Sequence, residues 1–498
     1  MAYFLLTGAT GLLGRYLLRD LTLADLPLAV VVRPTKWESA AQRIETAMAR
    51  WENELGRALV RPVVLEGDIA EPCLGLSAVD TEWVAANCGA VVHSAASLTF
   101  HAEEPTGEPW RSNVQGTRNV IELCERAGIR QYHHVSTAYV CGQRRGRILE
   151  SELDVGQQPG NDYERTKLMA EKEVLASSAF DQVTIYRPSI IVGDSRTGYT
   201  TSYHGFYTPL RLVYSLLQSV PWETILQSDW LGRLQLAGNE RKNLVSVEWV
   251  SAAMTWLIAH SEHHGQTYHL TNPTPATAGS MEQSMAEVLG ELVRDKPPAR
   301  ISSGVSGDIL ASFRDQMTVY ESYWSDDPEF DSTRTQAALP HLPCPEITHQ
   351  VMDRLIRFAT GANFGWPREA PIVSPFDVGA QMDRFAADDS LTFQANNNVQ
   401  PLNLHVSGPG GGQWHLLMDQ GRLVGAGRGV REDVGTTCYL TSSTIVELAR
   451  GDLTLEGSID SGRLVVAGNG VHTHQLAQLF RDLGTGDETR ILQKAMIG

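Results

Sequence analysis

The chain has 498 residues, of which 42% are hydrophobic and 20% charged, and its formal net charge at pH 7 is -17. This length predicts two or three domains, and the composition is that of a soluble globular protein. The acidic charge disfavours nonspecific binding to nucleic acid, which requires clustered Lys and Arg, and gives no general attraction to anionic membranes.

The amino terminus, Met1-Ala2-Tyr3, leads into an apolar strand without a basic segment or a cleavage site, which disfavours a secretory signal. No apolar run approaches the roughly 18 residues of a membrane-spanning helix. The six cysteines are scattered and form no CxxC pair, which fits a reducing compartment and neither a disulfide framework nor a zinc site. We therefore expect a cytoplasmic protein with no bound metal, no nucleic-acid partner and no integral membrane span.

Apolar strands alternate with amphipathic helices over the first two hundred residues. Near-continuous apolar strands separated by helices indicate a parallel sheet covered on both faces, so we predict a Rossmann-type, doubly wound α/β domain. The predicted helices include Ala40–Leu55 and Arg111–Ala127. The predicted strands are Tyr3–Thr7, Leu28–Arg33, Val60–Leu65, Ala90–Ser94, Tyr132–Thr137 and Val183–Ile191.

A glycine-rich turn follows the first strand and precedes the first helix. We expect Gly8 to permit a tight turn, Gly11 to let the backbone approach a pyrophosphate, and Gly14 to let helix and strand pack closely. The amino terminus of the helix then faces the phosphates. This strand–turn–helix context predicts a dinucleotide site. Its expected members are Thr7, Gly8, Thr10, Gly11, Leu12, Leu13 and Gly14.

The second strand ends in Arg33, where an NAD site would carry Asp or Glu. An arginine favours the 2′-phosphate of NADP, so we predict NADPH as the cofactor. Arg43, near the start of a helix, is a second candidate phosphate ligand, and Lys36 is a weaker one. The other cofactor contacts, expected past the third and fourth strands, are Asp68, Ile69, Ser94, Ala95 and Ala96.

Tyr163 and Lys167 lie four residues apart, behind Asn161 and Asp162, either of which can cap a helix. This spacing places the tyrosine and lysine side chains on one helix face. A tyrosine with its ordinary pKa of about 10 is a poor acid or base at neutral pH, and a nearby ammonium together with the nicotinamide ring favours the phenolate. The hydroxyl partner is expected at the end of the preceding strand, with Thr137 preferred and Ser136 as the alternative.

From about residue 195 to 362 the alternation becomes irregular and aromatic residues are frequent, so we assign this part to substrate binding within one domain of residues 1–362. The aromatic side chains either line a substrate pocket or belong to the ordinary core. Three prolines indicate a linker at residues 363–376.

Residues 377–498 are expected to form a separate α+β domain, because strands here follow one another without intervening helices. A helix is predicted at Ser442–Arg450, capped by Ser442 and ended by Gly451, and a second amphipathic stretch at Gln475–Leu483. The predicted strands are Leu402–Ser407, Gln413–Met418, Arg422–Ala426, Leu453–Ile459 and Arg463–Ala467.

The motifs together resemble the extended short-chain dehydrogenase/reductase superfamily, nearest the branch of fatty acyl-CoA reductases and of thioester reductase domains that terminate peptide and polyketide synthases. The matching stretches lie in order over residues 3–275 and include TGATGLLG, VVVRP, GDIAEPCLGL, VVHSAASLTFH, NVQGTRNV, VSTAYV, YERTK and YRPSIIVGDSRTG. The resemblance implies that Thr137, Tyr163 and Lys167 are the catalytic triad. It further implies that Asn113 anchors an active-site water and a helix bend, and that the nicotinamide end of the cofactor is completed by Arg187, Pro188 and Ser189.

By this resemblance the chain reduces an acyl thioester with NADPH to an aldehyde or an alcohol, while Tyr163 and Thr137 support the oxyanion. The sequence contains no adenylation or carrier domain, so a hydrophobic acyl or lipid substrate would arrive on coenzyme A or on an acyl carrier protein. Two alternatives stay open: an NAD(P)-dependent ketone or alcohol oxidoreductase, or epimerase, acting on a lipid, steroid or nucleotide sugar, and a non-enzymatic lipid-binding redox sensor. Homo-oligomerisation is also left open.

Residues of about 377–485 resemble the sterol-carrier-protein fold, through the stretches QWHLLMDQGRLVGAG, CYLTSSTIVELARGDL and GSIDSGRLVVAGN. The resemblance implies a tunnel for an acyl chain, a sterol or another long apolar molecule. The alternative is a generic α+β accessory domain, for example one used in dimerisation.

Overall fold

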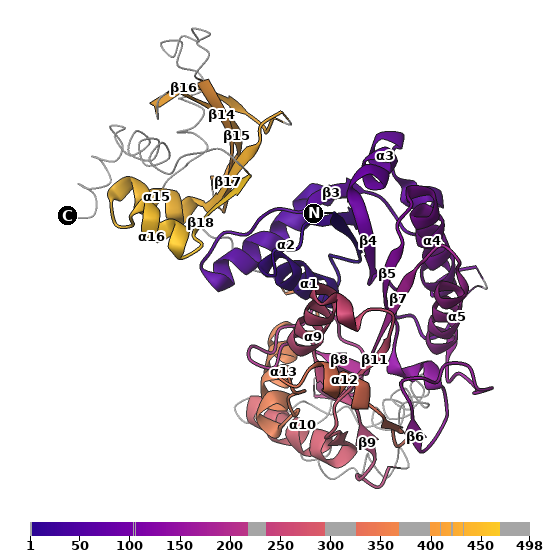
Figure 1. The fold of residues 1–498 in the computed structure, drawn as a ribbon. Helices are drawn as coiled ribbons and strands as arrows, with labels where there is room; N and C mark the ends of the chain where they lie inside the picture. The colour runs from indigo at the N-terminus through magenta and orange to yellow at the C-terminus, as the bar shows by residue number, and fades with distance from the viewer. Residues whose placement is uncertain are drawn as a thin grey trace. The chain divides into compact units, whose positions relative to one another are not determined.

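The structure is a computed structural model that describes residues 2–102, 104, 106–217, 236–293, 325–367, 399–408, 410–419, 422–431 and 433–468 (Figure 1). The chain divides into two compact units, Met1–Ala41 with Pro62–Arg368, and Gln42–Arg61 with Glu369–Gly498. The division after Arg368 falls within the segment proposed as a linker, of which residues 368–376 lie outside the described part of the chain. No helix among the described residues is long and apolar enough to cross a membrane.

The first unit is built on a seven-stranded sheet with the order β11-β7-β5-β4-β1-β2-β3, in which every neighbouring pair is parallel (Figure 1). The strand order reverses between β1 and β4, and in open α/β sheets ligands bind at the carboxyl ends of the strands beside such a reversal. The predicted Rossmann-type fold is thereby confirmed. The strands are β1 (Tyr3–Thr7), β2 (Leu28–Val32), β3 (Val63–Glu66), β4 (Cys88–His93), β5 (Gln131–Val135), β7 (Gln182–Pro188) and β11 (Thr267–Leu270).

Helices cover both faces of this sheet. On one face α4 (Gly116–Ala127) packs against α3 (Ala78–Asn87) and α5 (Asp162–Ala176), and on the other α1 (Leu12–Leu23) packs against α9 (Val247–Ala259) (Figure 1). The helix α4 is strongly amphipathic and ends at Gly128, whose φ of 73° is the left-handed conformation that glycine adopts most easily. Its apolar side, with Leu123, packs on Leu5 and Val91 of the central strands, so burial of this side holds the helix on the sheet.

Three sequence predictions are corrected at element boundaries. The predicted strand Val183–Ile191 breaks at Ser189 into β7 and β8 (Ile190–Val192), and β8 pairs with β10 (Leu244–Ser246) in a separate sheet. The Ser189 amide still donates to the Leu270 carbonyl oxygen of β11 at 3.2 Å, and the Ile190 amide then donates to the Asn243 carbonyl oxygen at 3.1 Å, which starts the pairing of β8 with β10. The predicted strand Tyr132–Thr137 ends at Val135, and the predicted helix Arg111–Ala127 begins with a π turn over Arg111–Gln115.

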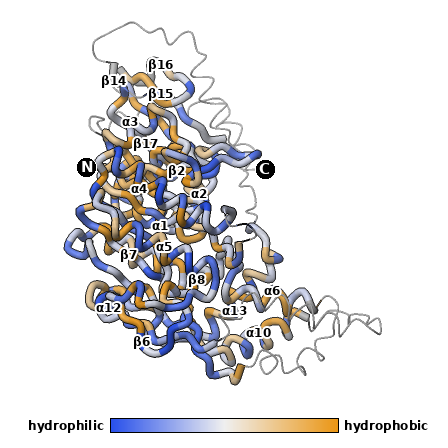
Figure 2. Tube along the Cα trace, turned by 90° about the vertical axis from the view of Figure 1, so that its right-hand side faces the viewer, coloured by the Kyte–Doolittle hydropathy of each residue, from blue (hydrophilic) through white to orange (hydrophobic). Residues whose placement is uncertain are grey.

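A second core in the first unit is made by α6 (Tyr207–Leu216), α10 (Ala278–Val293) and α13 (His349–Gly361). Hydrophobic and hydrophilic stretches alternate along α10 and α13, as expected of helices with one buried face (Figure 2). Phe206 and Tyr207 are buried in this core and Tyr203 packs against it, so these aromatic residues belong mainly to the core. Trp222 and Trp230 lie outside the described residues.

The second unit contains a five-stranded sheet with the order β16-β15-β14-β17-β18 (Figure 1). Helices α15 (Ser442–Arg450) and α16 (Leu455–Asp460) follow β17, and Leu416, Leu440 and Leu448 belong to the apolar core that the sheet and helices share. The strands are β14 (Val399–Ser407), β15 (Gly412–Asp419), β16 (Arg422–Arg428), β17 (Thr436–Thr441) and β18 (Leu464–Gly468).

Two predictions in the second unit are wrong. The segment Leu453–Ile459 is not a strand, because the Thr454 side chain accepts a hydrogen bond from the Gly457 amide at 3.0 Å and starts α16. The cap of α15 is Thr441 and not Ser442, although Gly451 ends this helix in the left-handed conformation as predicted. The strand β17 was not foreseen, and the stretch Gln475–Leu483 lies outside the described residues.

Candidate active site

A cavity of about 350 Å³ lies at the carboxyl ends of the central strands of the first unit. The structure brings together in its wall the glycine turn, the strand ends and the start of α5. The predicted site residues that line it are Gly8, Gly11, Leu12, Leu13, Gly14, Ser94, Ala96, Thr137, Tyr163, Lys167, Pro188 and Ser189.

The three glycines of the turn occupy different environments. Gly8 has a φ of 78°, and a Cβ on it would lie 2.6 Å from the amide nitrogen of Ala95. A Cβ on Gly14 would lie 1.9 Å from the Gly8 carbonyl oxygen, so only glycine allows the helix to pack this closely on the turn. Gly11 would meet only that same oxygen, at 3.4 Å, and it lines the cavity. A ligand phosphate can therefore approach the backbone at Gly11 and the amino terminus of α1.

Tyr163 and Lys167 both face the cavity from α5, whose cap is Asn161, since the Asn161 side chain accepts a hydrogen bond from the Glu164 amide at 2.9 Å. Burial raises the pKa of Tyr163 to about 12, although a hydrogen bond with the Thr137 side chain opposes this rise. Burial lowers the pKa of Lys167 to about 8, and the nearby Glu171 carboxylate opposes this decrease. The Lys167 ammonium donates to the Val135 carbonyl oxygen at 2.6 Å. The pKa of Tyr163 is therefore raised and not lowered as expected from the neighbouring lysine, and at neutral pH the tyrosine is a protonated donor.

Thr137 and Ser136 differ in where their hydroxyl groups bind. The Ser136 hydroxyl donates its proton to the Glu171 carboxylate at 2.6 Å, so it cannot donate that proton to a substrate. The Thr137 hydroxyl is 3.4 Å from the Pro188 carbonyl oxygen, which is a long and weak hydrogen bond, and it also interacts with Tyr163. Of the two candidates, Thr137 is therefore the one available to a substrate oxygen.

Arg187, expected at the nicotinamide end of the cofactor, lies elsewhere. Its side chain is 2% exposed and forms an ion pair at 2.5 Å with Glu171, which is fully buried. It also donates to the Glu152 carbonyl oxygen at 2.7 Å. Arg187 does not line the cavity, whereas the next two residues along the chain, Pro188 and Ser189, do. The Ser189 hydroxyl is buried and has no hydrogen-bond partner in the structure.

Asn113 lies in the π turn before α4, which is the helix bend that was expected there. Its side chain accepts from the Ser97 amide at 2.8 Å and donates to the Ser97 carbonyl oxygen and to the Thr166 hydroxyl, both at 3.0 Å. Asn113 therefore ties the loop after β4 to α5. Its expected role as the anchor of a water molecule stays a prediction.

Of the residues expected near the adenosine, Arg33 and Asp68 lie together, with an ion pair of 3.3 Å, and the Arg33 side chain is 70% exposed. The neighbouring Ile69 carbonyl oxygen accepts from the Asn119 side chain at 2.8 Å. Lys36 is exposed. Arg43 lies in α2 (Ala40–Leu55), among the residues that group with the second unit, so its position relative to Arg33 is not assigned.

Sequence reasoning missed the apolar and aromatic wall of the cavity beside Tyr163. The Phe100 ring lies 6.0 Å from the Tyr163 ring and 6.5 Å from the His204 ring. Burial lowers the pKa of His204, so this imidazole is neutral at neutral pH. Phe100 lies within the stretch VVHSAASLTFH, but nothing in that stretch indicates a place in the cavity wall, and His204 lies in no recognised motif. The wall also includes Leu98, Ile190, Ile191 and Trp366.

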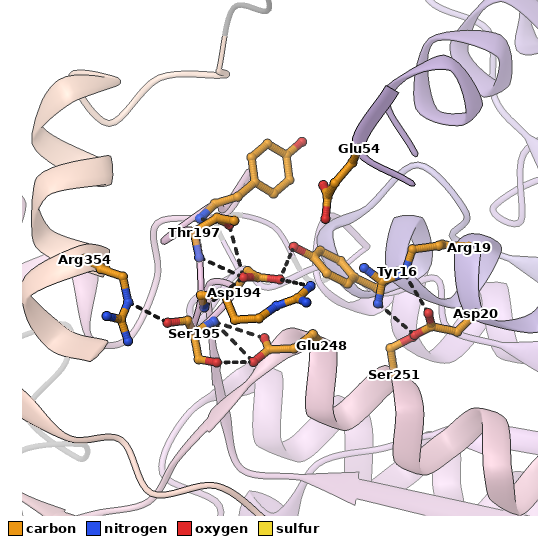
Figure 3. A network of polar contacts seen from close by, with 12 residues as sticks. Tyr16, Arg19, Asp20, Glu54, Asp194, Ser195, Thr197, Glu248, Ser251 and Arg354 are labelled. Carbon is orange, nitrogen blue, oxygen red and sulfur yellow. Dashed lines mark hydrogen bonds and ion pairs between the residues drawn. The ribbon is translucent and has the colours of Figure 1, made fainter. Parts of the chain in front are cut away.

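A polar loop that contains Asp194, Ser195 and Thr197 precedes His204 in the chain, and its contacts are drawn in Figure 3. The buried Asp194 carboxylate accepts from the Tyr16 hydroxyl of α1 at 3.1 Å. The Ser195 hydroxyl donates to the Glu248 carboxylate of α9 at 2.5 Å. Two helices of the Rossmann-type fold thus fix the loop, which leads directly to the wall residues. Among the described residues, no group of three or more His, Cys, Asp and Glu side chains could hold a metal ion.

Comparison with known proteins shows that this chain is similar to reductases. Residues 6–254 match the male sterility protein family. The terminal R domain from the myxalamid PKS-NRPS biosynthetic pathway, known from a crystal structure, is similar with a TM-score of 0.57 and 26% identity, covering 74% of this chain and 93% of that chain.

Two further relatives are enzymes that contain more than the matched part. Carboxylic acid reductase of Mycobacterium tuberculosis is 29% identical over 296 residues, which are 54% of this chain and 24% of that protein. Fatty acyl-CoA reductase wat of Drosophila melanogaster is 26% identical over 247 residues, which are 42% of this chain and 47% of that protein. In both of these relatives the matched part is less than half of the whole protein.

Proposed function

The chain belongs to the male sterility protein family, and from this premise we propose that it is an NADPH-dependent reductase of lipid-like acyl thioesters. Its reductase relatives make it an oxidoreductase with a nicotinamide cofactor. The proposal adds NADPH as the donor, a thioester carried on coenzyme A or an acyl carrier protein as the substrate, and an aldehyde or alcohol as the product. The scattered cysteines support the further proposal of a reducing, cytoplasmic compartment.

One observation carries the proposal: Thr137, Tyr163 and Lys167 line the same cavity as the glycine turn. The residues present also fit the cofactor. Gly11 leaves room for a pyrophosphate at the start of α1, and the buried Ser189 hydroxyl, which has no partner, is available to a polar group at the nicotinamide end. When bound, NADPH supplies the hydride.

The residues of the site then support the acyl oxygen and supply a proton. Tyr163 and Thr137 donate hydrogen bonds to the oxygen on which negative charge develops as the acyl carbon accepts hydride. Because the pKa of Tyr163 is raised, its hydroxyl stays protonated as a donor at neutral pH. Breaking the carbon–sulfur bond releases the aldehyde and a thiolate, which takes up a proton. If the aldehyde stays bound, it is reduced to the alcohol by hydride from a second NADPH, and the Tyr163 proton goes to the alcohol oxygen.

The proposal is tested by incubating the full chain with NADPH and acyl-CoAs of increasing chain length, with mass-spectrometric detection of aldehyde and alcohol. Free ketones, hydroxysteroids and nucleotide sugars serve as comparison substrates. Thioester-dependent oxidation of NADPH supports the proposal. Turnover of the comparison substrates, with no product from any thioester, would overturn it in favour of a ketone reductase or an epimerase.

We expect Arg33→Ala to weaken NADPH binding by about ten- to a hundredfold and to leave NADH binding nearly unchanged. A charge-assisted hydrogen bond to the 2′-phosphate is lost, and NADH has no such phosphate. The exposed Arg33 side chain contributes little to folding, so the effect is one on binding. Both dissociation constants are measured by cofactor fluorescence. An unchanged ratio of the two constants would place the phosphate site elsewhere.

We expect the rate of thioester reduction to fall as the pH rises through about 8, because the buried Lys167 ammonium loses its proton there. Below this pH the lysine is charged and supports the developing oxyanion through Tyr163, whereas above it the lysine is neutral. The measurement is the pH profile of kcat. In Lys167→Arg the guanidinium stays protonated, so the inflection near pH 8 should disappear. An inflection that persists in this variant would belong to another group.

For the second unit we propose a sterol-carrier-like domain that binds a long apolar molecule. The support is its α+β build, with a five-stranded sheet and two helices sharing one apolar core. The test is saturable binding of a fluorescent fatty acid to the full chain while NADPH and an acyl-CoA saturate the reductase cavity. Binding that survives this saturation supports a second lipid site, and its absence would leave an accessory domain.

A further inference from the structure

His93, at the end of β4, is buried at 1% exposure and is bonded to a threonine hydroxyl through each of its ring nitrogens. Nδ1 lies 2.8 Å from the Thr7 hydroxyl of β1, and Nε2 lies 3.1 Å from the Thr117 hydroxyl of α4. The two threonines belong to different elements, β1 and α4, so the imidazole bridges a strand of the sheet and a helix that covers it.

On the Nδ1 side the bridge reaches the glycine turn. The Ala95 amide donates to the Thr7 hydroxyl oxygen at 3.3 Å. Ala95 is also the residue that a Cβ on Gly8 would strike, at 2.6 Å from its amide nitrogen. The hydrogen bond to Thr7 therefore fixes the backbone against which the turn packs.

On the Nε2 side the bridge reaches the catalytic helix. The Thr117 hydroxyl donates to the Asn113 carbonyl oxygen at 2.7 Å, which fixes the π turn. The Asn113 side chain donates to the Thr166 hydroxyl, which in turn donates to the Tyr163 carbonyl oxygen at 2.9 Å. The chain of bonds therefore ends on the backbone of the catalytic tyrosine.

The directions of these bonds determine the tautomer of His93. Thr117 uses its proton on the Asn113 carbonyl, so its oxygen must accept from Nε2–H. A neutral ring carries only one proton, so Nδ1 is the unprotonated acceptor of the Thr7 hydroxyl proton, while the Thr7 oxygen also accepts from the Ala95 amide. Burial lowers the pKa of His93 to about 3, which keeps the ring neutral in this one tautomer at physiological pH.

We propose that His93 is a positioning residue that couples the cofactor turn to the catalytic helix, one through each ring nitrogen. The inference rests on the proposed function, since it concerns the same site, but it assigns a role that the reaction itself does not require of a histidine. Two other buried histidines of the sheet lack such a bridge. Among the residues that the structure describes, His133 bonds through Nδ1 to the Tyr186 hydroxyl and has no hydrogen-bond partner on Nε2, and neither ring nitrogen of His134 has one.

Two amide substitutions separate the halves of the bridge. In His93→Asn the side-chain oxygen stands near the former Nδ1 and can still accept from Thr7, but the bond to Thr117 is lost. In His93→Gln the amide nitrogen stands near the former Nε2 and can still donate to Thr117, but the bond to Thr7 is lost. Thr117→Val and Thr7→Val break the same two bonds from the other side, and His133→Asn is the matched control for a buried histidine outside the bridge.

Two readouts that do not depend on turnover are measured on the full chain: the NADPH dissociation constant, and amide hydrogen exchange over residues 161–168. We expect His93→Gln and Thr7→Val to weaken NADPH binding by about tenfold with little change in exchange. His93→Asn and Thr117→Val should bind NADPH within about twofold of the unmodified chain but exchange about tenfold faster at α5, with a matching loss of kcat.

The control His133→Asn should lower the melting temperature and move neither readout. Equal effects of the Asn and Gln variants, or the same pattern in His133→Asn, would reduce His93 to a core residue and overturn the proposal. If a His93 variant fails to fold, Thr7→Val and Thr117→Val test the same proposal: the first should weaken NADPH binding, and the second should speed amide exchange at α5. If the unmodified chain reduces no thioester, the proposed function fails, whereas binding and exchange still decide the role of His93.

Discussion

Replacing Tyr163 by Phe lowers kcat by about a thousandfold and leaves the NADPH dissociation constant within about twofold of its original value. The substitution removes one hydroxyl from the cavity and keeps the ring that packs edge-on against Phe100. Burial holds the pKa of this hydroxyl well above neutral, so the group being removed is a proton donor over the whole working range. Single-turnover kinetics together with cofactor fluorescence measure the two quantities.

A matched control is Tyr132→Phe. The Tyr132 hydroxyl is fully buried and has no hydrogen-bond partner in the structure, so its removal leaves no group unsatisfied. This variant should keep its kcat and its stability. If Tyr163→Phe retains more than about a tenth of kcat, the proton comes from elsewhere and the proposed mechanism is wrong.

Replacing Arg187 by Met lowers the free energy of unfolding of the first unit by about 3–5 kcal/mol. The partner, Glu171, is fully buried, and without the guanidinium it becomes an uncompensated charge in the protein interior. The Ser136 hydroxyl alone then bonds this carboxylate. Urea denaturation followed by tryptophan fluorescence measures the loss as a shift of the transition midpoint.

The double variant Arg187→Met, Glu171→Leu should recover much of this loss, since both charges leave together. A second carboxylate of α5, Glu173, provides the comparison: it lies 2.5 Å from the Arg118 guanidinium of α4, but 52% of the Arg118 side chain and 26% of the Glu173 side chain are exposed. Arg118→Met should cost less than about 1 kcal/mol. A similar loss at both sites, or no recovery in the double variant, would show that burial does not set the energy of the Arg187 pair.

Patterns that depend on local spacing were predictable from the sequence. The glycine turn, the capped helix with Tyr163 and Lys167 on one face, and the apolar parallel strands each follow from a few adjacent residues. Arg187 shows where this reasoning fails. Its place after an apolar run says nothing about a carboxylate sixteen residues earlier, and only the packing of α5 on β7 brings Glu171 to it.

The predicted ends of some helices and strands were wrong for a related reason, because single hydrogen bonds or pairings with a distant segment determine where an element begins and ends. Leu453–Ile459 has a strand-like composition, but the Thr454 cap turns it into a helix. Ile190 was predicted to belong to the strand Val183–Ile191, yet it leaves the sheet to pair with Leu244, more than fifty residues away in the chain. His204 reaches the cavity through contacts of its loop with α1 and α9, and those contacts leave no local pattern to recognise.

The three glycines of the turn are required for different reasons. Gly8 and Gly14 are required by the chain itself, because any side chain there would collide with backbone a few ångströms away. A Cβ at Gly11 would meet no protein atom closer than 3.4 Å, so under the proposed function the constraint at this position comes from the nucleotide. In related proteins that keep the fold but no longer bind the cofactor, we therefore expect other residues at position 11. Glycine should remain at positions 8 and 14, because the fold itself requires it there.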